Sequence, residues 1–203
     1  MEQPSSFDLA RLAALKEYAS LEHELCLLMR NLLGVDDPVA AAVFYQISNT
    51  RSRYAIIGRL IGLRPDPKWR AWAKIERWLT PCDTARNHLI HWFEDHYMRV
   101  TVTEDGGLKA ASAERVPWLR NATRRGSFSA DEKRYEAKDI FTERDNFRVA
   151  KHIVNRFQLT VWKPEEWPWT DIFQQPAGDL TPVEFLQLLN ERGHAARLPP
   201  YDR

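Results

Sequence analysis

The sequence has 203 residues, 44% of them hydrophobic, with eight tryptophans and a formal net charge of +1. This composition predicts a folded chain with a sizeable core, and the near-neutral charge excludes a global field of the kind that marks nucleic-acid or membrane-surface binders. The two cysteines show no metal or disulfide spacing, and neither a secretion signal nor a membrane-spanning run is apparent. We therefore expect a soluble cytoplasmic protein.

The first 80 residues are predicted to be helical. Capping residues and apolar residues at three- and four-residue intervals predict a long helix over 5–34. Asp37-Pro38 begins a second predicted helix, which ends near Gly62 and lies antiparallel to the first because the connection is short. A third, short helix is expected over 66–79.

A cap signal begins the next predicted helix. Thr80 precedes Pro81, which is pre-set for a first turn, so we expect this helix to begin at Pro81. Residues beyond it alternate in polarity on either side of a Gly-containing turn, which predicts a β-hairpin at about 97–116.

The rest of the chain is predicted to return to helix. Residues 117–128 are expected to be a loop, and a long last bundle helix is expected over 129–158. The proline-rich stretch 159–179 predicts irregular structure, and 181–193 predicts a small terminal helix. Two units follow from this pattern: a helical bundle over 1–165 and a C-terminal wrap-around segment with a short helix over 166–203.

Several groups capable of chemistry lie in the helix predicted from Pro81. Asn87, His91 and Asp95 are spaced four residues apart and form one line along a helix. Arg86 lies about 140° round the helix from His91, a gap that a long side chain or a second subunit could close.

These residues resemble a known motif. Arg86-Asn87 followed by His91 has the form R-N-x-x-x-H, which is similar to the R-x(4–6)-H motif of the HEPN superfamily. The predicted helices of about 6–160 also resemble the four- or five-helix up-down bundle of that family, with the β-hairpin as an insertion after the motif helix. Many members are metal-independent endoribonucleases, others are toxins paired with an antitoxin protein, and others are non-catalytic sensors or interaction modules.

The resemblance implies a homodimer that cleaves RNA at a site shared by two subunits. RNA supplies its own nucleophile, the 2′-hydroxyl, so the protein need only move protons and stabilise charge, without a cofactor. Arg86 is the candidate phosphate contact, Asn87 the positioning amide and His91 the general acid or base. Asp95 and His88 are candidate supporting residues, with Asp95 expected to orient the His91 ring one helical turn away.

Other interpretations remain open. The alternative function is a non-catalytic dimer that binds a nucleotide, RNA or a protein. Each motif residue taken singly fits a structural role, such as an ion pair between Arg86 and Asp83. A metal site at His88, His91 and Glu94 is disfavoured because the outer two positions splay around a helix and no second helix offers a matching pair.

Further basic residues and one thiol are weaker candidates. A depressed thiol pKa at Cys82 is possible in a first helical turn, but a structural thiol fits better. Basic side chains on the second helix and in the later loop could bind nucleic acid, although a solvated helix face and a flexible hinge are the simpler explanations. These side chains are Arg51, Arg53, Arg124 and Arg125.

Overall fold

A computed structural model describes residues 6–64, 71–105, 108–120, 135–174 and 178–195. The described residues form a mainly helical protein with one two-stranded antiparallel sheet, as the sequence predicts. The elements in chain order are α1 (Ser6–Leu33), α2 (Asp37–Gln46), α3 (Thr50–Gly62), α4 (Trp72–His91), β1 (Phe93–Asp105), β2 (Leu108–Arg120), α5 (Ala137–Trp162), α6 (Thr170–Gln174) and α7 (Pro182–Ala195).

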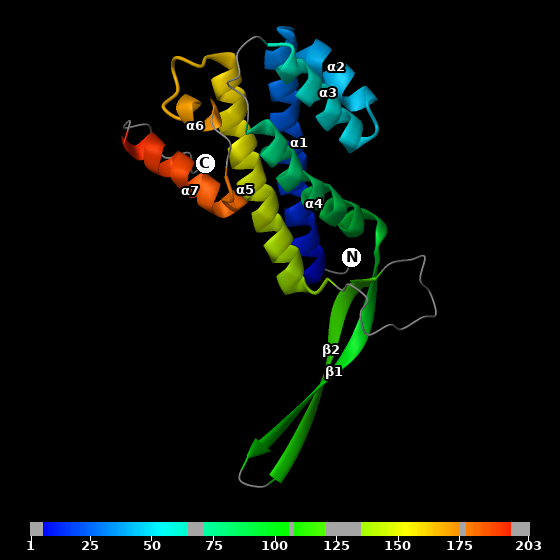
Figure 1. The fold of residues 1–203 in the computed structure, drawn as a ribbon. Coiled ribbons are helices and arrows are strands. Elements are labelled where there is room, and N and C mark those ends of the chain that lie inside the picture. Colours follow the sequence, from blue (N-terminus) through cyan, green and yellow to red (C-terminus); the bar gives the residue numbers. More distant parts are fainter. Residues whose placement is uncertain (1–5, 65–70, 106–107, 121–134, 175–177, 196–203) are drawn as a thin grey trace.

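Helices α1 and α5 run parallel and side by side through the length of the body (Figure 1). Lys151 donates to Glu17 near the middle of this pair, and Asn31 donates to Gln158 near its end. The predicted first helix over 5–34 is confirmed. Its core residues recur every three or four positions, so each turn of α1 buries an apolar side chain.

Helix α4 runs antiparallel to α1 and is continuous through Pro81. The predicted helix start at Pro81 is therefore wrong. The reason is a buried stripe that crosses the proline without a break and packs the whole helix against the core. Its members are Trp72, Ile75, Leu79, Cys82, Ala85 and Leu89.

The predicted single helix over 37–62 is also wrong, because α2 and α3 are separate helices. Asn49 caps α3 by accepting from the backbone N–H of Ser52, and the carbonyl of Ile47 accepts from the side chain of Arg53. Helix α2 turns back along α1, whereas α3 runs in the same direction as α1 (Figure 1). A Ser-Asn-Thr cap at 48–50 was the local signal for this break.

The hairpin is confirmed, but it is longer than the predicted 97–116. Its register runs from Phe93 paired with Arg120 to Asp105 paired with Leu108. Residues 94–96 are consequently in a strand and not in α4, and 117–120 belong to β2 and not to a loop. Figure 1 shows the hairpin as an arm that projects from the lower end of the helical body.

The C-terminal part packs on α5 and α4. The predicted terminal helix is confirmed as α7, whereas part of the expected irregular stretch 159–179 is helical, as the end of α5 and as α6. Trp169, Phe173 and Phe185 are buried in the same apolar cluster as the residues of α1. Among the described helices, none is both long enough and apolar enough to cross a bilayer.

Candidate functional site

The motif residues lie on or beside the outward stripe of α4. This stripe is exposed because the opposite side of the helix carries the buried residues described above. Its spacing of three and four residues places all of its members on one face of the helix. The exposed members are Ala73, Arg77, Thr80, Thr84, Asn87 and His91.

Arg86 and Asn87 are in direct contact. The Arg86 Nη1 donates to Asn87 Oδ1 at 2.9 Å. The Arg86 guanidinium is half-buried and lies 5.7 Å from the centre of the Tyr18 ring. His91 is exposed one turn beyond Asn87, so a cation, an amide and an imidazole occupy neighbouring positions at the end of one helix.

A partly buried carboxylate lies behind Arg86. Asp83 Oδ1 accepts from the hydroxyl of Tyr18 at 2.6 Å and from that of Tyr54 at 2.8 Å. Burial raises the pKa of Asp83, while the two tyrosine hydrogen bonds and the nearby Arg86 act in the opposite direction. The carboxylate thus joins α1, α3 and α4 directly beneath the motif.

Arg11 was not expected at this site. Its Nε donates to the carbonyl of Leu89 at 2.5 Å, and its Nη2 donates to those of Ile90 and Trp92 at 3.1 and 3.3 Å. The carbonyls of Leu89 and Ile90 are in the last turn of α4 and have no partner within the helix, so the guanidinium caps the helix and complements its dipole. Arg11 therefore fixes the turn that carries His91.

His88 points to a different part of the molecule from His91. Its Nδ1 lies 3.1 Å from the Tyr135 hydroxyl, and its ring stacks on Trp92 with centroids 4.0 Å apart. Tyr135 in turn forms a β-bridge with Leu119 of the hairpin. His88 therefore packs at the junction between α4 and the hairpin.

The expected position of Asp95 one helical turn beyond His91 is wrong. Helix α4 ends at His91, and Trp92 has extended backbone angles that start the hairpin. Asp95 lies on β1, where its carboxylate is 3.5 Å from the buried Arg120 guanidinium. No orienting role toward the His91 ring follows from this position.

The four additional arginines have different environments. Arg51 is exposed in the first turn of α3. Arg53 is buried, pairs with Glu22 at 2.6 Å and lies over the Phe44 ring at 4.5 Å, so its guanidinium faces the protein interior. Arg124 and Arg125 lie outside the described residues.

The structure also bears on two alternatives raised by the sequence, a reactive Cys82 thiol and a metal site. Cys82 is buried within α4, and burial raises its thiol pKa to about 12, opposite to the effect of a first helical turn. The metal set considered from sequence is separated, because His88 and His91 end a helix whereas Glu94 belongs to a strand. Within the described ranges, no three His, Cys, Asp or Glu side chains gather to hold a metal ion.

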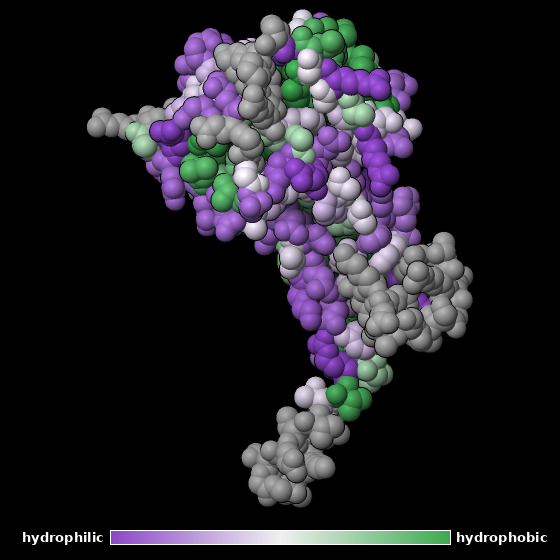
Figure 2. All heavy atoms as spheres, viewed as in Figure 1, coloured by the Kyte–Doolittle hydropathy of each residue, from purple (hydrophilic) through white to green (hydrophobic). Residues whose placement is uncertain are grey.

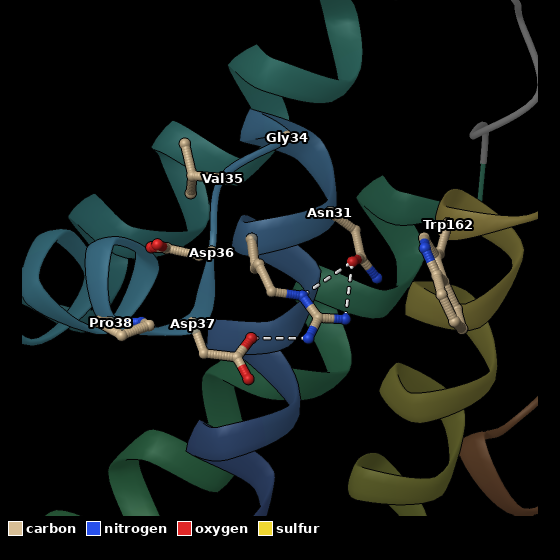
Figure 3. A pocket seen from close by; sticks show the side chains of 8 residues that line it. Asn31, Gly34, Val35, Asp36, Asp37, Pro38 and Trp162 are labelled. Carbon is tan, nitrogen blue, oxygen red and sulfur yellow. Dashed lines mark hydrogen bonds and ion pairs between the residues drawn. The ribbon is translucent and has the colours of Figure 1, made fainter.

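A pocket of about 620 Å³ lies at the other end of α1, where α1, α2 and α5 meet (Figure 3). Its charged groups are already engaged, since Arg30 donates to Asp37 at 2.7 Å and to the side chain of Asn31. Trp162 forms the opposite wall. None of the three motif residues lines this pocket.

Comparison with family models, curated proteins and solved structures finds no match to this chain. The resemblance to HEPN proteins therefore depends on Arg86, Asn87 and His91 and on the helices that carry them.

Proposed function

We propose that this chain is a HEPN-like, metal-independent endoribonuclease that acts as a homodimer. One observation carries the proposal. The guanidinium of Arg86 is joined to the side chain of Asn87, and the exposed imidazole of His91 follows one turn later on the same face of α4 as Asn87.

These groups suit cleavage by the 2′-hydroxyl of RNA. The 2′-oxygen attacks phosphorus and the bond to the 5′-oxygen breaks, which yields a 2′,3′-cyclic phosphate and a 5′-hydroxyl. Arg86 offers a permanent forked donor to the phosphate oxygens, where negative charge builds up in the transition state. An imidazole titrates near neutral pH, so His91 can accept the 2′-proton or donate a proton to the leaving oxygen.

The two-subunit arrangement follows from the number of proton-transfer groups needed. One base and one acid are needed, and His91 is the exposed histidine of the motif, since His88 contacts Tyr135. A two-fold axis beside the exposed stripe of α4 supplies a second imidazole from the other subunit. It also brings each His91 toward the Arg86 and Asn87 of the other subunit.

The test is cleavage of mixed RNA by purified protein in EDTA. We expect products with 2′,3′-cyclic phosphate ends from the wild type, and at least a hundredfold loss of rate in Arg86→Ala and His91→Ala because each removes a charge-stabilising or proton-transfer group. Arg59→Ala and His23→Ala are matched controls at exposed positions on α3 and α1.

The controls should keep the wild-type rate. Cleavage that survives in both motif variants would identify a contaminating nuclease and reject the proposal. Saturable RNA or nucleotide binding without cleavage would instead identify a non-catalytic HEPN-like binding protein.

A further inference from the structure

The pocket at the junction of α1, α2 and α5 has a chemistry that the proposed function does not use. Its volume of about 620 Å³ is in the range of small-molecule sites. Figure 2 shows hydrophobic and hydrophilic residues side by side at this end of the body, where α2 lies. Arg30 lines the pocket and is about 28 Å along α1 from Arg11, which caps the α4 turn that carries His91. A small molecule in the pocket is therefore out of reach of His91.

The turn from α1 to α2 brings one guanidinium and two carboxylates to the pocket. Gly34 ends α1 in a left-handed conformation with a φ of 68°, which glycine adopts without strain, and its N–H donates to the carbonyl of Arg30. Asp36 then caps α2 by accepting from the backbone N–H of Val39 at 3.1 Å. Asp37 follows and accepts from Arg30 Nη1 at 2.7 Å. The turn itself thus holds these charged side chains in place.

Trp162 lies across the pocket from this turn (Figure 3). It is 53% exposed, although tryptophan is highly buried on average. The Lys163 ammonium lies over its ring, 4.9 Å from the centre, but Lys163 does not line the pocket. The part of the indole that faces the pocket is therefore not the part that the lysine covers. It presents a flat apolar surface on which another ring can stack.

The charges of the lining disfavour a simple ion. Arg30, Asp36 and Asp37 give the lining a net charge of −1, which opposes an anion, while a cation would lie next to the Arg30 guanidinium. Within the described residues, Arg30 uses three of its five N–H groups to donate to Asn31 and Asp37, and each aspartate accepts through one oxygen. Donors and acceptors therefore remain side by side, and a ligand that both accepts and donates fits them.

Guanine has this pattern along one edge. Its O6 is an acceptor, and the neighbouring N1–H and the 2-amino group are donors. The paired Arg30 and Asp37 offer the opposite order, a guanidinium N–H beside a carboxylate. Proteins hold single bases in this way, by hydrogen bonds to the base edge and by stacking on an aromatic ring, here Trp162. Adenine has one donor group on the corresponding edge and therefore makes one hydrogen bond fewer to a carboxylate.

We propose that the pocket lined by Arg30, Asp37 and Trp162 binds a guanine base. The inference goes beyond the proposed function, because the pocket is remote from His91 and its ligand need not be cleaved. Free guanine nucleosides and nucleotides carry this base, and so does RNA, so the experiments below separate the two sources.

The first experiment is calorimetric titration of the full chain with three nucleosides. Guanosine should bind with a dissociation constant on the order of 0.1 mM, as expected for a ligand of its size. Inosine lacks the 2-amino group and should bind several-fold more weakly. Adenosine should bind about tenfold more weakly or worse, because it leaves a carboxylate oxygen without a partner.

The second experiment removes the stacking surface. Trp162→Ala should weaken guanosine binding by about tenfold or more, since stacking on an aromatic ring supplies much of the affinity for a single base. Phe141→Ala is the matched control. Phe141 is also an exposed aromatic residue of α5 with a cation over its ring, the Arg144 guanidinium at 5.0 Å, and its loss should leave guanosine binding unchanged.

The third experiment changes the carboxylate. Asp37→Asn replaces an acceptor by an amide donor, so the preference for guanosine over adenosine should fall by about tenfold. Asp171→Asn is the matched control, because Asp171 is likewise an exposed aspartate paired with an arginine, Arg192 at 2.6 Å. It should keep the wild-type preference.

The source of the base is found with two short 2′-O-methyl RNAs, UUGUU and UUAUU, which lack the 2′-hydroxyl nucleophile. Binding of UUGUU that is tighter than that of guanosine, with UUAUU bound more weakly, identifies RNA as the source. Binding of UUGUU that is no tighter than that of guanosine identifies a free nucleoside or nucleotide. Either result supports a guanine site.

Four results would overturn the inference. These are no saturable guanosine binding up to about 1 mM, ten times the expected constant, adenosine bound as tightly as guanosine, Trp162→Ala with wild-type affinity, and weakened guanosine binding in His91→Ala, which would place the base at the motif. Guanosine binding without RNA cleavage by the wild type keeps the pocket and rejects the nuclease. Cleavage without guanosine binding does the reverse.

Discussion

Two charged side chains occupy the faces that α1 and α4 turn toward each other. Arg11 lies between Phe7 and Ala14 in the stripe of α1 that is otherwise apolar, and Asp83 lies among the buried residues of α4. A charged group in such a position is costly unless it is paired or hydrogen-bonded. Arg11 donates to a carbonyl in the last turn of α4, and Asp83 accepts from the hydroxyl of Tyr18. Both contacts hold the part of α4 that carries the motif, so the packing of α1 against α4 supports the proposed chemistry.

Arg11→Met tests the cap at the end of α4. The thioether keeps much of the side-chain volume but loses the charged donors to Leu89, Ile90 and Trp92, so we expect about 1.5–3 kcal/mol of lost stability in urea unfolding. RNA cleavage should fall as well, because the turn that carries His91 is no longer held.

Lys16→Met is the control for this change. Lys16 is exposed on the same helix, and its replacement should leave both stability and cleavage unchanged. Arg11→Met with wild-type stability would show that the capping hydrogen bonds contribute nothing.

Asp83 gives a prediction about pH. In Asp83→Ala the hydroxyls of the buried Tyr18 and Tyr54 lose their acceptor, so we expect about 1–3 kcal/mol of lost stability, whereas Asp83→Asn keeps an oxygen for both. Because folding raises the pKa of Asp83, its contribution to stability is fully present below about pH 3.8 and declines as pH rises through the folded value.

The stability of Asp83→Asn relative to wild type should therefore rise between pH 4 and pH 8. Urea unfolding of both proteins at the two pH values measures this difference, since other carboxyl groups contribute equally to each. A relative stability that falls over the same interval would show that the folded protein favours the ionised carboxylate.

Apolar periodicity and local cap signals can give different predictions of where a helix begins. Regular apolar spacing predicted α1, the start signal at Thr181-Pro182 predicted α7, and alternation predicted the hairpin. Local signals failed where packing outweighed them. Thr80-Pro81 has the form of a helix start, but the buried residues Leu79 and Cys82 continue the same stripe on either side of it.

Only part of the candidate site could be predicted from the sequence, because local signals did not reveal where α4 ends. The relation of Arg86, Asn87 and His91 depends on helical spacing alone, and it lies within α4 as expected. The position of Asp95 depends on where α4 ends. The carbonyls at that end are capped by Arg11, which is far away in sequence. No local pattern around His91 contains that information.

Pro81→Ala tests how much the proline opposes α4. Pro81 is exposed and inside the helix, where it lacks an N–H donor and crowds the preceding turn. We expect the alanine variant to be more stable by about 2–3 kcal/mol in urea unfolding. Thr84→Ala, at the next exposed position, should change stability much less, and a Pro81→Ala protein of lower stability would mean that the proline is needed for the path of α4.

At the scale of the whole molecule, one apolar core runs from Phe7 of α1 to Leu189 of α7. Phe185 of α7 connects the C-terminal part to the bundle, because its ring lies 5.3 Å from that of Trp78 on α4 and 5.7 Å from that of Phe173 on α6. The sequence predicted a helical bundle over 1–165 and a C-terminal segment over 166–203 that wraps round it. A continuous core implies that both parts unfold together.

Phe185→Ala distinguishes these two behaviours. Truncating a buried phenylalanine costs about 3–5 kcal/mol, a large fraction of the stability of an ordinary domain. We expect a single unfolding transition, with tryptophan fluorescence and far-ultraviolet circular dichroism shifted to the same lower midpoint. Leu188→Ala, a partly exposed position on α7, should shift both by far less. Separate transitions for the two probes, with the α1–α5 signal unmoved by Phe185→Ala, would instead mean that residues 166–203 fold as a unit of their own.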